Sequence, residues 1–299
     1  MRIAGVDIGT NTILMAIADY DGNLKIIRDE HSLARLGQDL NRTGIISEEA
    51  LIRAVKILDK YRTICDDLNV DIIKAVGTSA LRDAINSNEV VTILSNALNS
   101  DIEVISGSKE AQLSFLGTIE DNQESIVIDI GGGSTEITYG KSDNIFNHIS
   151  LQIGAVRITE EFLQPHPPLT SSIHKAIDRI NSILDSIDFR NNECKFYAVA
   201  GTPTTLASIS LGLKDFEREK VHLYRLTKNK IDELVDLLFR TEIKDIINKF
   251  GVNPMRADVI SAGGLILKLI MEKFGTDSVI VSANGLRIGI IKSIIKNIN

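Results

Sequence analysis

The sequence predicts an α/β protein of two domains, and three observations support this class. Strand-like segments alternate with segments that have the 3.6-residue period of helices, which is typical of helices layered on partly parallel strands. The pattern starts again after the polar stretch DNQES at 121–125. The 299 residues, 43% of them hydrophobic, are enough for two moderate domains with cores. We therefore expect a first domain at 1–122 and a second at 123–283, with the C-terminal helix at 284–299 packing back on the first.

The first half begins with strand-like segments at 2–8, 12–19 and 24–30. The clearest helix is predicted at 47–68, where Ser47 can cap the first turn. The face of this helix is expected to consist of Leu51, Val55, Leu58, Arg62 and Cys65. A strand at 70–76, a helix near 88–99, a strand at 102–106 and a helix at about 108–118 are expected to follow.

The second half repeats this beginning. VIDIGGGSTEITYG predicts a strand, a turn and a second strand, and NIFNHISL predicts a third. The proline-rich stretch QPHPPL at 164–169 indicates a turn between two helices. CKFYAVA is predicted as a buried strand, and further helices and the strand SVIVSA complete the chain.

Composition and charge limit the classes of function. The net charge of −7 argues against a general nucleic-acid binder, which normally carries a basic surface. No apolar run approaches the ~20 residues of a membrane span, and MRIAGVDIGTN leaves no room for a signal sequence. Cys65 and Cys194 lack metal-ligand spacing and are expected to be buried free thiols, and the five histidines show no zinc-binding pattern. We expect a cytoplasmic protein without nucleic-acid or membrane partners.

A glycine-rich turn in the second half predicts a phosphate site. IVIDIGGGSTEITYG at 126–140 joins two strand-like runs through three glycines, and VDIGTNT at 6–12 has a similar start. Successive N–H groups in a tight turn bind anions, and glycine has no side chain to block the approach. A plain wide turn is the alternative for either stretch alone, but the repetition favours a ligand. The residues expected to contact phosphate are Thr10, Asn11, Thr12, Gly131, Gly132, Gly133, Ser134 and Thr135.

Carboxylates beside these turns predict a magnesium site. Asp129 ends an otherwise apolar strand, and Asp7 has the same place in the first half. Mg²⁺ takes few protein ligands and keeps several waters, so such carboxylates can hold it. Glu136, just past the glycine turn, is expected to act at the metal or at the attacking water. The alternatives are turn-capping roles for the two aspartates and an ordinary solvent-facing strand position for Glu136.

The order of motifs resembles one known family. The paired DxG hairpins resemble the phosphate loops of the superfamily of actin, sugar kinases and heat-shock chaperones. The motifs VGTSALRDAIN, ISGSKEAQLSFLG, AGTPTTLAS, NPMRADVISAGGLIL and VSANGLRIG resemble, in this order, the exopolyphosphatase and guanosine pentaphosphate phosphohydrolase family in its short two-domain form. The resemblance covers nearly the whole chain. It implies two actin-like, ribonuclease H-like domains with a cleft between them.

The resemblance also implies an activity and further site residues. The expected reaction is Mg²⁺-dependent release of terminal phosphate from inorganic polyphosphate or guanosine pentaphosphate. Glu110 is expected to orient and deprotonate the attacking water, and Arg82 and Arg256 are expected to bind phosphate, which a guanidinium matches bidentately. Taken alone, Glu110 suits a helix-dipole partner and Arg82 an ion pair with Asp83 or a solvated charge, and Arg256 is a weaker phosphate candidate than Arg82.

The sequence departs from the family pattern at three positions. Lys109 stands where the family usually has a second acid, Ala155 where a cysteine is often seen, and Ile288 where a glutamate follows GLR. These changes bear on fine specificity.

Two other functions remain as alternatives. One is a small-molecule kinase of the same superfamily that uses ATP, and the other is a regulator that binds nucleotide or polyphosphate without catalysis. Polyphosphate and guanosine pentaphosphate present the same terminal group and are not ranked, and a homodimer is left open.

Overall fold

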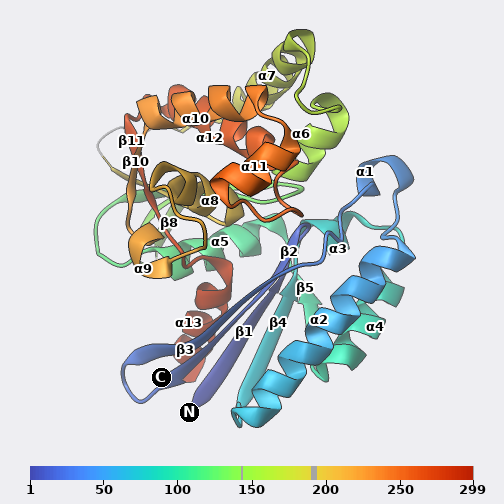
Figure 1. The fold of residues 1–299 in the computed structure, drawn as a ribbon. Helices are drawn as coiled ribbons and strands as arrows, with labels where there is room; N and C mark the ends of the chain where they lie inside the picture. The colour runs from blue at the N-terminus through green and yellow to red at the C-terminus, as the bar shows by residue number, and fades with distance from the viewer. Residues whose placement is uncertain (143, 190–193, 299) are drawn as a thin grey trace. The chain divides into compact units, whose positions relative to one another are not determined.

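The computed structural model describes residues 1–142, 144–189 and 194–298. The chain forms two compact units, one from Met1–Gly117 together with Leu286–Asn299 and one from Thr118–Gly285. Each unit contains one β-sheet with helices packed against it (Figure 1).

The sheet of the first unit has the order β3-β2-β1-β4-β5. Its strands are β1 (Arg2–Ile8), β2 (Thr12–Tyr20), β3 (Leu24–Leu33), β4 (Ile72–Gly77) and β5 (Ile102–Val104). The first three are antiparallel neighbours, whereas β4 and β5 run parallel to β1. The helices are α1 (Leu40–Thr43), α2 (Glu48–Asp67), α3 (Ser79–Asp83), α4 (Ser87–Leu98), α5 (Gly107–Thr118) and α13 (Leu286–Ile298). Helices α2 and α4 cover one face of the sheet and α13 the other.

The sheet of the second unit has the order β10-β11-β9-β6-β7-β8. Its strands are β6 (Ser125–Ile130), β7 (Thr135–Lys141), β8 (Asn144–Leu151), β9 (Lys195–Val199), β10 (Arg225–Thr227) and β11 (Ser278–Val281). The helices are α6 (Ala155–Phe162), α7 (Thr170–Leu184), α8 (Gly201–Ser210), α9 (Arg218–Val221), α10 (Lys228–Arg240), α11 (Ile243–Phe250) and α12 (Ile260–Phe274). One apolar core joins β6 and β9 to α7, α8 and α12.

The two sheets repeat one topology. The series β8-β7-β6-β9-β11 has the same order and the same strand directions as β3-β2-β1-β4-β5, and β10 is an addition at one edge. The echo between VDIGTNT and IDIGGGST in the sequence therefore reflects an equivalent turn in each sheet, between β1 and β2 and between β6 and β7. This repetition confirms the predicted α/β class, with one sheet of the same topology in each unit.

Helix α2 begins as predicted, but its buried face differs by about one residue from the expected one. The Ser47 hydroxyl accepts a hydrogen bond from the Ala50 N–H, as an N-cap does. Arg62 was expected on the inner face and is exposed; Tyr61 is buried instead, and its hydroxyl donates to the Ile13 carbonyl at 2.9 Å. The buried residues are Ala50, Ala54, Leu58, Tyr61 and Cys65. The two small alanines allow α2 to lie close to its neighbours, and the pattern of large apolar residues alone could not show this.

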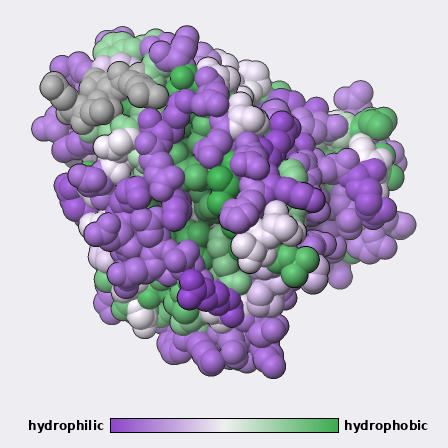
Figure 2. All heavy atoms as spheres, turned by 90° about the horizontal axis from the view of Figure 1, so that it is seen from above, coloured by the Kyte–Doolittle hydropathy of each residue, from purple (hydrophilic) through white to green (hydrophobic). Residues whose placement is uncertain are grey.

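The structure shows the surroundings of the two cysteines and the hydropathy of one face of the protein. Neither cysteine forms a disulfide. Cys65 is buried as expected, whereas Cys194 is only half-buried, and burial raises the pKa of each thiol to about 11. The face drawn in Figure 2 is mostly hydrophilic, with smaller hydrophobic areas between the polar side chains. Among the described helices, none combines the length and the hydropathy that a bilayer crossing requires.

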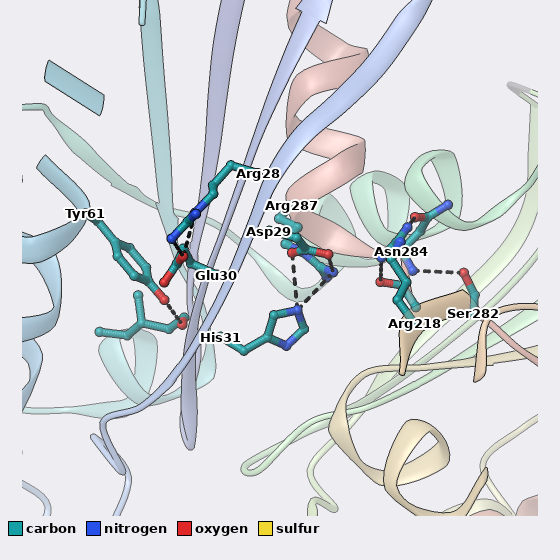
Figure 3. A network of polar contacts seen from close by, with 11 residues as sticks. Arg28, Asp29, Glu30, His31, Tyr61, Arg218, Ser282, Asn284 and Arg287 are labelled. Carbon is teal, nitrogen blue, oxygen red and sulfur yellow. Dashed lines mark hydrogen bonds and ion pairs between the residues drawn. The ribbon is translucent and has the colours of Figure 1, made fainter. Parts of the chain in front are cut away.

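The C-terminal helix α13 belongs to the first unit. Ile288 and Ile291 pack against Ile3 of the sheet. The buried guanidinium of Arg287 donates from Nε and Nη2 to the two carboxylate oxygens of Asp29 on β3, at 2.7 and 2.8 Å (Figure 3). An apolar contact and a bidentate ion pair therefore join the end of the chain to its first strands.

Candidate active site

Helix α6 holds the glycine turn of the second unit through hydrogen bonds to the carbonyls of the turn. The turn closes with a hydrogen bond from the Gly131 N–H to the Ser134 carbonyl at 3.0 Å. The Gly131 carbonyl accepts from the Ala155 N–H, and the Gly132 carbonyl accepts from the N–H groups of the next two residues of α6. These are the N–H groups at the start of a helix that have no partner within it. The carbonyls of the turn therefore face the N-terminus of α6.

The same bonds fix where the N–H groups of the turn point. A trans peptide is planar, with its C=O and N–H on opposite sides. Because the carbonyls of Gly131, Gly132 and Gly133 point at α6 residues, the N–H groups of Gly132, Gly133 and Ser134 point away from that helix. In the described parts of the chain these three N–H groups donate to no acceptor. Gly133 and Ser134 are buried, and a buried donor without a partner costs about 1–3 kcal/mol. The turn thus presents three parallel donors suited to an anion.

The glycines of this turn and Thr135 have different roles. None of the three glycines has a left-handed backbone conformation. Their value is therefore the missing side chain; a Cβ at Gly131 would lie 3.0 Å from the Ser134 carbonyl oxygen. Thr135 was expected to donate to phosphate, but its fully buried hydroxyl donates to the Ile153 carbonyl at 2.7 Å. Thr135 holds the neighbouring chain segment, and its one proton is already used.

Asp129 and Glu136 are direct cross-strand partners on β6 and β7. Side chains at directly opposite positions lie about 5 Å apart at Cβ, and two like charges there are destabilising. Glu136 is only 1% exposed, and one of its oxygens accepts from the Ser150 hydroxyl at 2.7 Å. The alternative of an ordinary solvent-facing position for Glu136 is therefore wrong. A buried carboxylate opposite a half-buried one is an arrangement that a cation stabilises.

These residues fit magnesium better than a metal held by many ligands. Among the described residues no group of three or more His, Cys, Asp and Glu side chains is arranged to hold a metal. Mg²⁺ is usually bound by one or two carboxylates together with water and phosphate oxygens. Asp129 and Glu136 beside an anion-binding turn match that requirement.

The equivalent turn of the first unit has a similar backbone but a different chemistry. It closes from the Gly9 N–H to the Thr12 carbonyl at 2.9 Å. The Thr10 and Asn11 carbonyls accept from the N–H groups of residues 34, 35 and 37, so a loop takes the place that α6 has in the second unit. The strand partner of Asp7 is Leu14, which corresponds to Glu136. The first unit thus repeats the turn and lacks the second acid.

Arg82 and Glu110 lie together in the first unit. Nη1 of Arg82 donates to a Glu110 carboxylate oxygen and to the Ile105 carbonyl, both at 2.9 Å. The alternative ion pair for Arg82, with Asp83, is replaced by this one. Nη2 of Arg82 is buried and has no acceptor among the described residues. Arg82 therefore keeps a donor for an anion while its other nitrogen holds the carboxylate.

Arg256 lies against the start of α8 in the second unit. Its Nη1 donates to the Gly201 carbonyl at 3.3 Å and to the Thr205 hydroxyl at 3.1 Å. A Cβ on Gly201 would lie 2.7 Å from the guanidinium carbon, so a side chain at this position would require Arg256 to shift. Burial lowers the pKa of Arg256 to about 10, and in the described chain no carboxylate pairs with it. A half-buried guanidinium without a carboxylate partner suits a phosphate ligand better than a solvated charge.

The three departures from the family pattern fall in different places. Lys109 is exposed and donates from Nζ to Gln112 at 3.1 Å. Ala155 is the first residue of α6, and its N–H supports the glycine turn. Ile288 is 1% exposed in the contact of α13 with its sheet. Of the three, only Ala155 contacts a predicted phosphate-binding residue directly.

Sequence reasoning missed the residues that support the turns. Arg157 donates from Nε to the Gly133 carbonyl at 2.9 Å. Gly154 leaves space for the turn, since a Cβ there would lie 2.3 Å from the Gly132 carbonyl oxygen. Both residues lie in IGAVR at 153–157, a stretch in which only Ala155 is singled out by the sequence. Its only signal was a glycine just before a helical pattern.

Comparison with known proteins gives a consistent result. The family model described as "Ppx/GppA phosphatase family" matches residues 16–298. The chain is 36% identical to the bifunctional 3-dehydroquinate synthase/phosphatase of Fusobacterium nucleatum, over 98% of this chain and 46% of that protein. It is 29% identical to Exopolyphosphatase 2 of Mycobacterium tuberculosis, over 98% of both. This chain thus spans about half of the first relative and nearly all of the second.

A solved structure extends the likeness to three dimensions. The Aquifex aeolicus member of the Ppx/GppA family has a TM-score of 0.84 at 30% identity, and the match covers 100% of this chain and 99% of that one. The family that the order of motifs suggested is therefore confirmed by two independent kinds of comparison. This chain belongs to the Ppx/GppA phosphatase family.

Proposed function

We propose that this chain hydrolyses the terminal phosphoanhydride bond of inorganic polyphosphate or guanosine pentaphosphate in a Mg²⁺-dependent reaction. The observation that carries the proposal is the set of three N–H groups at Gly132, Gly133 and Ser134, which point to one side and have no acceptor in the described chain. They suit the oxygens of a terminal phosphate. The family assignment and the name of the exopolyphosphatase relative support the same chemistry.

Each proposed role follows from the surroundings of a side chain. Asp129 and Glu136 would hold Mg²⁺, which when bound neutralises charge on the phosphate. Glu110 accepts the proton of the attacking water, and its ion pair with Arg82 requires the anionic carboxylate that can do so. Arg82 and Arg256 offer guanidinium groups to phosphate oxygens. Phosphoryl transfer depends mainly on such positioning and charge neutralisation.

The reaction balances without a further reagent. Water forms the new P–O bond to the terminal phosphorus, and the bridging P–O bond breaks. The water proton passes to Glu110, and the shortened polyphosphate or nucleotide leaves with the bridging oxygen. The products are orthophosphate and a substrate with one phosphate fewer.

A phosphate-release assay tests the proposal. The purified chain is given Mg²⁺ with polyphosphates of several lengths, guanosine pentaphosphate or ATP, side by side. We expect release from polyphosphate or guanosine pentaphosphate to exceed release from ATP, and chelation of Mg²⁺ to stop it. Faster release from ATP would contradict the proposal. Transfer of phosphate from ATP to an added acceptor would support a kinase, and binding without turnover would support a regulator.

A further inference from the structure

We infer that Arg157, together with the start of helix α6, positions the phosphate-binding turn and so sets its affinity and the rate of the reaction. The inference rests on the proposed function, because it assumes that the turn at 131–134 binds phosphate. Arg157 does not appear among the residues that the motifs assign to phosphate, metal or water. Its role is visible only in the contacts of α6.

The turn needs a restraint from outside. Three consecutive glycines have the largest conformational freedom of any short segment. Each of their peptide planes can in principle rotate and turn its N–H away from the ligand. A carbonyl that is bonded on the opposite side prevents this rotation, because the C=O and N–H of one peptide unit move together.

Helix α6 supplies the restraint for two of the three peptide units with its backbone. The Gly131 carbonyl accepts from the Ala155 N–H at 2.9 Å, and the Gly132 carbonyl accepts from Val156 and Arg157 at 2.9 and 3.1 Å. These bonds orient the N–H groups of Gly132 and Gly133. They depend on Gly154, since any side chain there would displace the turn.

The third peptide unit depends on a side chain. The Gly133 carbonyl accepts from Nε of Arg157 at 2.9 Å, and this bond orients the N–H of Ser134. Nη2 of Arg157 donates to the side chain of Gln152 at 3.2 Å, which helps to hold the guanidinium plane. Because Nε bonds the carbonyl side of the turn, opposite to the N–H groups, Arg157 acts on phosphate through the turn. We therefore assign it as a positioning residue.

The test compares Arg157→Gln, Arg157→Lys and the control Arg179→Gln, which removes the charge of an exposed arginine on α7 in the same unit. Each protein is labelled with ¹⁵N-glycine and titrated with inorganic phosphate while the amide resonances of Gly132 and Gly133 are followed. Turnover number and Michaelis constant are measured with polyphosphate, and the thermal unfolding midpoint is measured in parallel.

We expect Arg157→Gln to weaken phosphate binding and kcat/KM by about 10- to 100-fold, the factor that corresponds to one charge-assisted hydrogen bond. Arg157→Lys can still donate to the Gly133 carbonyl and should recover part of the loss. Arg179→Gln should match the unaltered protein. If Arg157 were only structural, its variants would unfold at a lower temperature, yet the folded protein would keep its phosphate affinity and turnover, and the inference would be overturned.

Two further outcomes separate this inference from the proposed function. If the Gly132 and Gly133 resonances of the unaltered protein do not respond to phosphate, both are wrong. If they respond equally in the unaltered protein and in Arg157→Gln, only the positioning role is wrong. Should Arg157→Gln fail to fold, Gln152→Ala keeps the arginine and loosens its guanidinium; a loss of a few-fold in phosphate affinity supports the inference, and an unchanged affinity overturns it.

Discussion

Two glutamates at predicted catalytic positions are almost fully buried, and their neighbours distinguish their roles. Glu110 is 8% exposed and forms an ion pair with Arg82. Glu136 is 1% exposed and lies opposite Asp129 across two strands. A carboxylate beside a guanidinium is stabilised in the anionic form that can accept a proton, whereas a bound cation would stabilise a carboxylate opposite another carboxylate. The two residues should therefore respond differently to the same substitution.

Glu110→Gln should lower the turnover number by about 10²- to 10⁴-fold, because general-base assistance is lost while size is kept. The Mg²⁺ concentration for half-maximal activity should stay the same. Since the lost interaction belongs to the transition state, the turnover number and kcat/KM should fall together. Steady-state phosphate release at varied Mg²⁺ measures all three quantities. A variant with near-normal turnover would exclude Glu110 as the base.

Glu136→Gln should instead raise the Mg²⁺ concentration needed for half-maximal activity. The amide is a poorer ligand than the carboxylate and no longer balances the cation's charge. It also removes the repulsion with Asp129, so the free energy of unfolding without Mg²⁺ should be unchanged or higher. Activity against Mg²⁺ concentration and urea unfolding with and without Mg²⁺ test this. If Mg²⁺ dependence is unaltered and turnover is abolished, Glu136 is the base.

Helix α2 shows how much of an element can be predicted from local sequence. Its start at Ser47 and its length follow from capping and periodicity, both of which are properties of neighbouring residues. Its inner face differed by one position because the exposed Arg62 was counted in the apolar period and the alanines were not. Which of two adjacent stripes is buried depends on the sheet against which the helix packs.

Ser47→Ala should lower the free energy of unfolding by about 1 kcal/mol, because the Ala50 N–H loses its side-chain acceptor. Ser47→Asp keeps an acceptor and adds a charge favourable to the helix dipole, so it should be at least as stable as the unaltered protein. Urea unfolding followed by circular dichroism measures both. Equal stability of the alanine variant and the unaltered protein would show that the cap contributes nothing.

At the scale of the whole chain, one ion pair joins residues 258 positions apart. Arg287 on α13 bonds both oxygens of Asp29 on β3, and His31 also bonds Asp29 at 3.2 Å (Figure 3). Burial raises the pKa of Asp29, but the hydrogen bonds from His31 and Arg287 outweigh it, and the net pKa lies well below the usual range. The Asp29 carboxylate is thus more stable in the folded than in the unfolded chain.

The resulting pH dependence has a definite sign. A depressed folded pKa stabilises the protein above the unfolded value of about 3.9 and loses that contribution as the pH falls toward the folded pKa. At pH 7, Arg287→Gln should cost about 3 kcal/mol, because Asp29 loses its bidentate partner. The difference in unfolding free energy from the unaltered protein should shrink below about pH 4. Denaturant unfolding from pH 2.5 to 7 measures it, and a difference that is constant with pH would contradict the assignment.

Asp29→Asn provides the matched control for this pair. The asparagine cannot titrate, so its effect should show the same decline at low pH as that of Arg287→Gln. In the double variant the two effects should be clearly less than additive, as expected for residues in contact. Additive effects would show that the two side chains act separately.

The sequence by itself determined the fold class, the two repeated turns, the family and the acids beside the glycines. Periodicity, capping and glycine-rich turns depend only on neighbouring residues. The order of motifs can likewise be recognised without knowing any tertiary contact. Tertiary structure alone decided the partners: Arg82 with Glu110, Arg157 with the glycine turn, and the hydroxyl of Thr135 with a neighbouring carbonyl. A hydrogen bond depends on two groups meeting within about 3 Å. Residues far apart in the sequence reach that distance only when sheets and helices have packed, so no local pattern could assign these roles.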